Sequence, residues 1–69
     1  MRVHKIEILR NNQPSPEDME LIDMVNDMDY IDYDFNVAHK IQHPEYREKA
    51  ITRIRHLYRQ EEINARLDE

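Results

Sequence analysis

Residues 30–41, with the sequence YIDYDFNVAHKI, alternate apolar and polar side chains with a period of two. The odd-numbered side chains of this segment, apolar with one exception, are those of Ile31, Tyr33, Phe35, Val37, His39 and Ile41. Successive side chains of a strand point to opposite faces, so the pattern predicts a β-strand over 30–41 with one buried and one wet face. Every other element has to pack against this strand or pair with it.

Three further elements are predicted around this strand. Residues 2–9 are rich in β-branched side chains and alternate in polarity, which predicts a first strand. Ser15 and Pro16 suit the N-cap and first position of a helix over 16–29, and Pro44 opens a second helix over 44–66. The order predicts a small α/β fold of βαβα layout in a single domain, 1–69, with a two-stranded sheet packed by two helices.

The predicted sheet is too small to stand alone. Two strands make a marginally stable sheet, and both of its edges are open to further pairing. A core of this size rarely supplies more than about 3–5 kcal/mol unless disulfides, a metal or association add to its stability. We therefore expect a homo-oligomer, most simply a dimer in which the sheet can continue from one copy to the next.

The composition excludes several classes of function. The chain has no Gly and no Cys, so it has no Gly-rich phosphate loop, no disulfide framework and no thiolate nucleophile. No apolar run approaches the roughly 20 residues of a membrane span. Its single Ser and single Thr have no evident base beside them in sequence. We expect a non-enzymatic protein of the cytoplasm with no cofactor and no membrane partner.

Two patterns suggest metal ligands, and neither satisfies its motif. His39 and His43 are four residues apart, which places them about 13 Å apart along a strand rather than on one turn of a helix. The acidic residues between 23 and 34 lack the Gly and Glu that a calcium-binding EF-hand loop needs at its sixth and twelfth positions. The sequence therefore predicts no metal site.

Charge is divided along the chain, although the net charge is −5. Residues 17–34 contain acidic side chains and no Lys or Arg, whereas most of the charged residues in 40–59 are Lys or Arg. On the predicted first helix, Glu20, Asp23 and Asp27 form an acidic stripe. One interpretation is that Lys49 and Arg53 of the second helix neutralise the stripe. The other is that the stripe faces a protein partner with a basic surface.

Two further surfaces are candidates for contact. Met19, Ile63 and Leu67 lie off the apolar stripes of their helices, which is typical of a contact with a second copy or with a partner. Arg55, Arg59 and Arg66 lie along one side of the second helix and could follow a phosphate backbone. Nucleic-acid binding through this Arg stripe is the alternative function.

The opening residues Met1–Leu9, followed by an acidic helix and a second strand, resemble small early phage proteins of strand–helix–strand layout. The long basic second helix is not part of that pattern. The resemblance implies a small host-directed interaction protein, acting in the host cytoplasm, and it carries over no functional residues. We therefore expect a protein–protein interaction module that regulates or inhibits a larger machine through the acidic face of its first helix.

Overall fold

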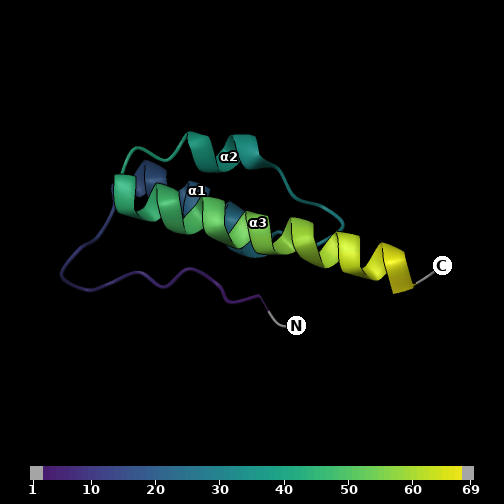
Figure 1. Ribbon diagram of the computed structural model, residues 1–69. Coiled ribbons are helices and arrows are strands. Elements are labelled where there is room, and N and C mark those ends of the chain that lie inside the picture. Colours follow the sequence, from purple (N-terminus) through teal and green to yellow (C-terminus); the bar gives the residue numbers. More distant parts are fainter. Residues whose placement is uncertain (1–2, 68–69) are drawn as a thin grey trace.

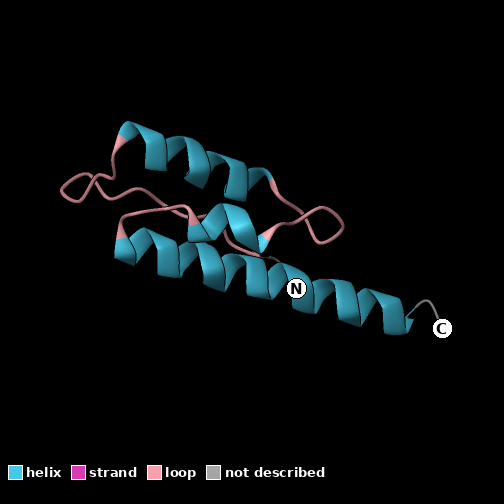
Figure 2. Cartoon of the chain, turned by 90° about the horizontal axis from the view of Figure 1, so that it is seen from above, coloured by secondary structure: helices cyan, strands magenta, loops and turns pink. Residues whose placement is uncertain are grey.

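The computed structural model describes residues 3–67, except for the side chain of Leu67, and these residues contain helices but no sheet (Figure 1). The helices are α1 (Pro16–Asp27), α2 (Phe35–His39) and α3 (Pro44–Leu67). Helices α1 and α3 lie side by side, α2 covers one side of this pair, and the N-terminal segment runs along the other side (Figures 1 and 2). The molecule is elongated, with extents of 45 × 20 × 16 Å, because α3 extends well past its neighbours (Figure 2).

Helices α1 and α2 begin where a side chain accepts from their free backbone N–H groups. The Ser15 hydroxyl accepts from the Asp18 N–H at 3.2 Å and starts α1. The Asp34 carboxylate accepts from the Asn36 N–H at 2.9 Å and starts α2. Helix α1 ends at Asp27, two residues before the expected end at 29, and α3 runs to Leu67, one residue past the expected end.

The predicted strand over 30–41 is wrong. Residues 30–34 are a loop, and residues 35–39 form helix α2. Ile31, expected to be buried, is 74% exposed, whereas Ala38, expected on the wet face, is fully buried. Val37, Ala38 and Ile41 have the spacing of one helical face, and they reach the core together. The alternation of apolar and polar residues over 30–41 therefore arose by chance in a short capped helix and the loops on either side of it.

The predicted strand over 2–9 is also wrong in the described part, residues 3–9, because the segment has no partner strand. Its only ladder contact is an isolated antiparallel bridge between Leu9 and Asn12. Side chains replace the missing strand. The Asn26 amide exchanges two hydrogen bonds with the backbone of Ile6, at 2.7 and 3.1 Å, and the Tyr46 hydroxyl accepts from the Leu9 N–H at 3.0 Å.

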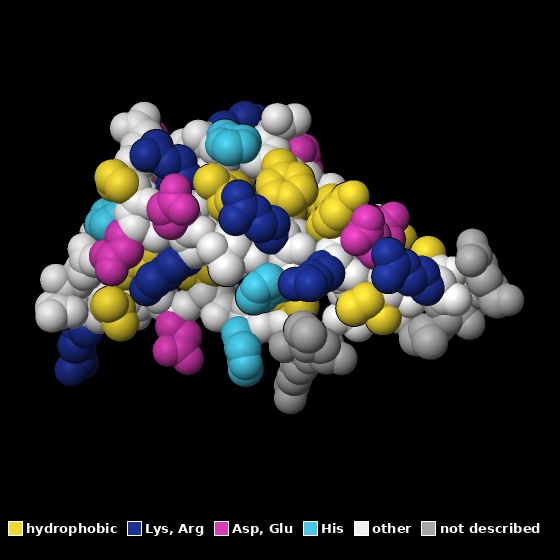
Figure 3. Space-filling view, viewed as in Figure 1, with side chains coloured by type: hydrophobic (Ala, Val, Ile, Leu, Met, Phe, Trp, Pro, Cys, Tyr) yellow, Lys and Arg dark blue, Asp and Glu magenta, His cyan; other side chains and the backbone are white. Residues whose placement is uncertain are grey.

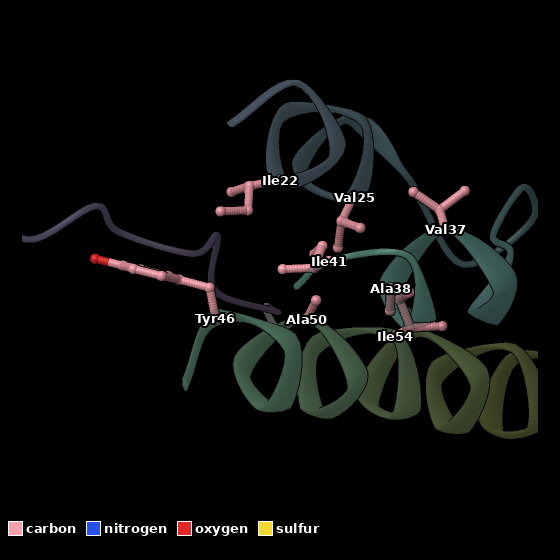
Figure 4. Close-up of a cluster of buried hydrophobic side chains, with 8 residues drawn as sticks. All are labelled: Ile22, Val25, Val37, Ala38, Ile41, Tyr46, Ala50 and Ile54. Carbon is pink, nitrogen blue, oxygen red and sulfur yellow. The ribbon is translucent and has the colours of Figure 1, made fainter. Parts of the chain in front are cut away.

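The two-stranded sheet and the βαβα layout are therefore replaced by a helical fold. The argument for dimerisation from two open sheet edges within one chain loses its basis as well. The core lies instead between the helices, where residues from each helix and Ile41 meet (Figure 4). Its buried hydrophobic members are Ile22, Val25, Val37, Ala38, Ile41, Tyr46, Ala50 and Ile54. This core holds α1 and α2 in place and so positions the acidic surface between them.

Candidate protein-binding surface

The acidic stripe lies on the exposed side of α1. Glu20, Asp23 and Asp27 are all exposed, whereas Ile22 and Val25 of the same helix are buried in the core. The helix is amphipathic, so packing of its apolar face fixes the carboxylates in an outward row. The first helix thus presents the three residues that the sequence identified as one surface.

The stripe leads into a hollow between the end of α1 and the start of α2. The hollow has a volume of about 380 Å³, and its lining consists of Met24, Asp27, Met28, Asp32, Tyr33, Asp34 and Val37. Asp27 belongs to both the stripe and the hollow. Met24 is 52% exposed, which is high for a large apolar side chain. The lining thus combines apolar side chains with three carboxylates.

Two of the nearby carboxylates also hold the backbone. Asp29 accepts from the N–H groups of Ile31 and Asp32 at 2.9 and 2.8 Å, which closes the loop after α1. Asp34 caps α2, as described above. The loop and the cap thus fix the backbone beside the hollow, and the cap also holds the Asp34 carboxylate, which lines it.

Arg53 does not neutralise the stripe. Its guanidinium is buried and donates to backbone carbonyl oxygens at 2.9–3.3 Å; those oxygens belong to Val3, His4, Val25, Asn26 and Met28. An arginine has five N–H donors, so this set uses all of them. Burial lowers the pKa of Arg53 from its ordinary value. The carbonyls at the end of α1 suit a cation, because the helix dipole is negative there.

Lys49, the second residue expected to neutralise the stripe, lies beside an aromatic ring. Its ammonium is 5.3 Å from the centre of the Tyr46 ring. A cation is attracted to the face of an aromatic ring, so Lys49 has an interaction partner within α3 itself. The interpretation in which the stripe pairs internally with Lys49 and Arg53 therefore has little geometric support.

The Arg stripe of α3 is on the surface. Arg55, Arg59 and Arg66 are exposed. Lys and Arg side chains recur along the face that carries α3, with hydrophobic and acidic side chains between them (Figure 3). A phosphate backbone would thus meet a mixed surface rather than a continuous basic one.

The candidate apolar contacts are partly exposed. Met19 is 38% exposed and Ile63 is 41% exposed, while the side chain of Leu67 lies outside the described residues. Met19 and Ile63 lie on different helices, α1 and α3, so they do not form one helical stripe. Tyr58, on α3, is also exposed, at 46%, and its ring packs edge-on against Tyr33, with centroids 6.2 Å apart.

The histidines do not gather into a metal site. Among residues 3–67 no group of three or more His, Cys, Asp or Glu side chains is placed to hold a metal ion. His39 is exposed at the end of α2, whereas a half-buried strand position was expected. His43 precedes α3, and its Nε2 lies 3.0 Å from the Asn12 Oδ1. Within the same residues, no helix has the length and apolarity needed to cross a bilayer.

Sequence reasoning missed the residues that hold the elements together. Asp18 is buried, and its carboxylate accepts from the Gln42 and His43 N–H groups at 3.0 Å each, just before α3. Asn26 and Arg53 bind the N-terminal segment, as described above. Two signals were available: Asp18 lies in the first turn of a helix, and Arg53 lies among the apolar residues of α3. Neither position indicates which groups the side chain binds.

Comparisons with known proteins found no match among family models, curated proteins or solved structures. The resemblance to small early phage proteins accordingly remains a prediction from the opening residues.

Proposed function

We propose that this chain is a non-enzymatic protein-binding module that takes a basic, amphipathic segment of a partner on the acidic face of α1. The observation that carries the proposal is the continuity of the stripe with the apolar hollow through Asp27. Charge alone attracts many partners, but an acidic row beside a hollow with apolar side chains in its lining selects a segment that carries both basic and apolar side chains.

The chemistry of the partner follows from the two parts of the surface. Lys or Arg side chains of the partner pair with Glu20 and Asp23 along α1, and an apolar side chain enters the hollow beside Met24. Methionine is unbranched and flexible, so it adapts to apolar side chains of different shapes. A module of this kind suits a regulator or inhibitor that occupies the basic surface of a larger machine, in the cytoplasm of a host if the protein is encoded by a phage.

The test compares two double variants with the same change in net charge. Asp23→Asn with Asp27→Asn removes two of the three carboxylates of the stripe, and Glu7→Gln with Glu48→Gln removes two exposed carboxylates outside the stripe and the hollow. The probe is a labelled amphipathic peptide of Lys and Leu, with an all-polar Lys/Ser peptide of equal charge beside it. We expect the stripe variant to weaken binding of the Lys/Leu peptide about tenfold, mainly through the association rate, and the control variant to leave it unchanged.

A separate variant tests the apolar part. Met24→Gln should weaken the Lys/Leu peptide and leave the Lys/Ser peptide unaffected, since only the former places an apolar group in the hollow. Equal losses for both double variants would mean that only net charge matters, and the proposal would fail.

The alternative function, nucleic-acid binding by Arg55, Arg59 and Arg66, is tested with duplex DNA. A phosphate-binding surface loses affinity steeply as salt rises, with a slope set by the number of phosphates contacted. DNA binding that has such a slope and disappears in an Arg55→Gln, Arg59→Gln variant would favour the alternative.

A further inference from the structure

We propose that the Arg stripe on α3 of one copy of this chain binds the acidic stripe on α1 of a second copy, so that copies stack side by side in one orientation. The inference rests on the proposed function, because it names the basic, amphipathic segment that the acidic face of α1 takes. That segment is the second half of α3, and the partner is the same chain.

The two stripes lie on opposite sides of the helix pair. On α1, Ile22 and Val25 are buried in the core, and the acidic stripe is exposed. On α3, Ala50 and Ile54 are buried in the same core, and the Arg stripe is exposed. The helical period places each stripe across its helix from these buried residues. One molecule thus carries opposite charges on two separate faces, which suits a head-to-tail contact between copies.

Helices α1 and α3 run in the same direction. Asp18, near the start of α1, accepts from the two backbone N–H groups just before α3. Arg53, within α3, donates to carbonyls at the end of α1. Figures 1 and 2 show the resulting side-by-side arrangement, with the end of α3 extending past α1. Copies stacked in one orientation therefore bring the Arg stripe alongside the acidic stripe with the two helices parallel.

The spacing of the charges selects one register. Arg55 and Arg59 are four residues apart on α3. Asp23 and Asp27 are four residues apart on α1, so each pair spans about 6 Å along its helix axis. With the helices parallel and Arg55 beside Asp23, both arginines face an aspartate at once. A shift of one turn in either direction keeps only one of the two pairs.

The exposed glutamates of α3 are consistent with this register. Glu48 then lies level with the first residue of α1, and Glu62 lies past its last residue, so neither faces the acidic stripe. If the same pairs formed with the helices antiparallel, Glu62 would lie level with Glu20, and like charges would repel. The charges of α3 therefore favour the parallel arrangement that stacking in one orientation produces.

An apolar contact accompanies the charges. Ile63 is 41% exposed and lies four residues past Arg59, so it projects from a neighbouring part of the same helix surface. In the parallel register it lies level with the loop after α1. In that loop Ile31 is 74% exposed, and Met28 lines the hollow. The exposed Ile63, which lies off the apolar stripe of its own helix, thus obtains an apolar partner.

The first experiment reverses the charges on each face separately. One variant carries Asp23→Arg and Asp27→Arg, and the other carries Arg55→Asp and Arg59→Asp. Sedimentation equilibrium over about 5–1,000 μM measures self-association, which we expect to be at least about tenfold weaker in each variant than in the wild type. An equimolar mixture should recover association, because each variant offers the face that complements the reversed face of the other.

Net charge gives the opposite expectation for the first variant. Each Asp→Arg substitution adds two positive charges, so the net charge of −5 becomes −1. If only overall repulsion mattered, this variant would associate more strongly than the wild type. Thermal melts control for folding, and Asp→Asn with Arg→Gln at the same four positions replaces any reversed variant that does not fold. Ile63→Gln should weaken association without changing its net charge.

The second measurement is the size of the assembly. A contact between copies in one orientation leaves a free face at each end, so the average mass should pass that of a dimer as the concentration rises. A wild type that stays monomeric up to about 1,000 μM overturns the proposal, as does an assembly that the reversed variants leave intact. If that monomer still binds the Lys/Leu peptide, stacking is refuted and the proposed function stands. Absence of peptide binding refutes the proposed function itself.

Discussion

At the scale of single residues, Arg53 is a buried cation that makes five hydrogen bonds to backbone carbonyls. It is 6% exposed and bonds to the carbonyls at the end of α1 and to those of the N-terminal segment. A buried charge without a carboxylate partner is tolerated when hydrogen bonds satisfy it fully, and here every N–H of the side chain has an acceptor. The residue therefore joins three parts of the molecule with one side chain.

Replacement of this side chain should be costly even when the charge is kept. Arg53→Lys leaves three donors in place of five and shortens their reach, so at least two buried or partly buried carbonyls lose their partner. We expect a loss of about 3 kcal/mol in the free energy of unfolding, measured by urea denaturation. Arg55→Lys, on the exposed side of the same helix, is the matched control and should change stability by less than about 0.5 kcal/mol. Equal effects of the two variants would contradict the role assigned to Arg53.

Tyr33 gives a prediction in alkaline solution. A hydrogen bond with Glu61, together with burial and nearby carboxylates, raises the pKa of Tyr33 from 10.0 to about 12. Because the folded state holds this proton more tightly than the unfolded state, the stabilisation is complete below pH 10 and is lost as the pH rises from 10 to 12. Absorbance titration of the tyrosinate should show one late-titrating residue. That residue should titrate earlier in Glu61→Gln and disappear in Tyr33→Phe.

At the scale of elements, the sequence signals for helix ends were more reliable than those for strands. Ser15 and the two prolines at 16 and 44 mark the starts of α1 and α3 because capping is local chemistry. The period-two pattern over 30–41 failed because a five-residue helix between two loops places few residues on each face. Alternation over so short a helix does not distinguish it from a strand.

The predicted strand over 2–9 was wrong for a different reason. Its pattern describes an extended chain, but which groups pair with it depends on the whole fold. Asn26 and Tyr46 come from separate helices, and nothing near residues 3–9 in the sequence identifies them. Of the candidate surface, the stripe on α1 could be identified from spacing alone. The hollow could not, because α2, which closes it, was not expected.

Asp18 provides the prediction at this scale. Its two carboxylate oxygens accept from the Gln42 and His43 N–H groups before α3, where the positive end of the helix dipole favours an anion. Asp18→Asn keeps one acceptor and leaves a partly buried N–H without a partner, so we expect a loss of about 1–3 kcal/mol in thermal or urea unfolding. Asp23→Asn, on the exposed face of the same helix, should leave stability unchanged or slightly higher because it removes the repulsion from Asp27.

At the scale of the whole molecule, the net charge of −5 predicts how stability responds to salt. Repulsion among the exposed carboxylates of α1 and the following loop is screened as ionic strength rises. We expect the free energy of unfolding to increase by about 0.5–1 kcal/mol between 10 and 200 mM NaCl, and this increase to shrink in the Asp23→Asn, Asp27→Asn variant. Stability that falls with salt would instead indicate that internal ion pairs dominate, the interpretation that the position of Arg53 argues against.

The reach of Arg53 across the chain also sets an order of events during synthesis. Its bonds to Val3 and His4 span 50 and 49 residues, and the Tyr46 bond to Leu9 spans 37. Contacts between residues so distant in sequence form late and carry a large loop-closure cost, which makes folding slower than in a bundle of local contacts. The first half of the chain leaves the ribosome without the groups that fix it. In a nascent chain stalled before residue 53, the part outside the ribosome should therefore be sensitive to protease, and the last third of the sequence should bring protection to the first residues.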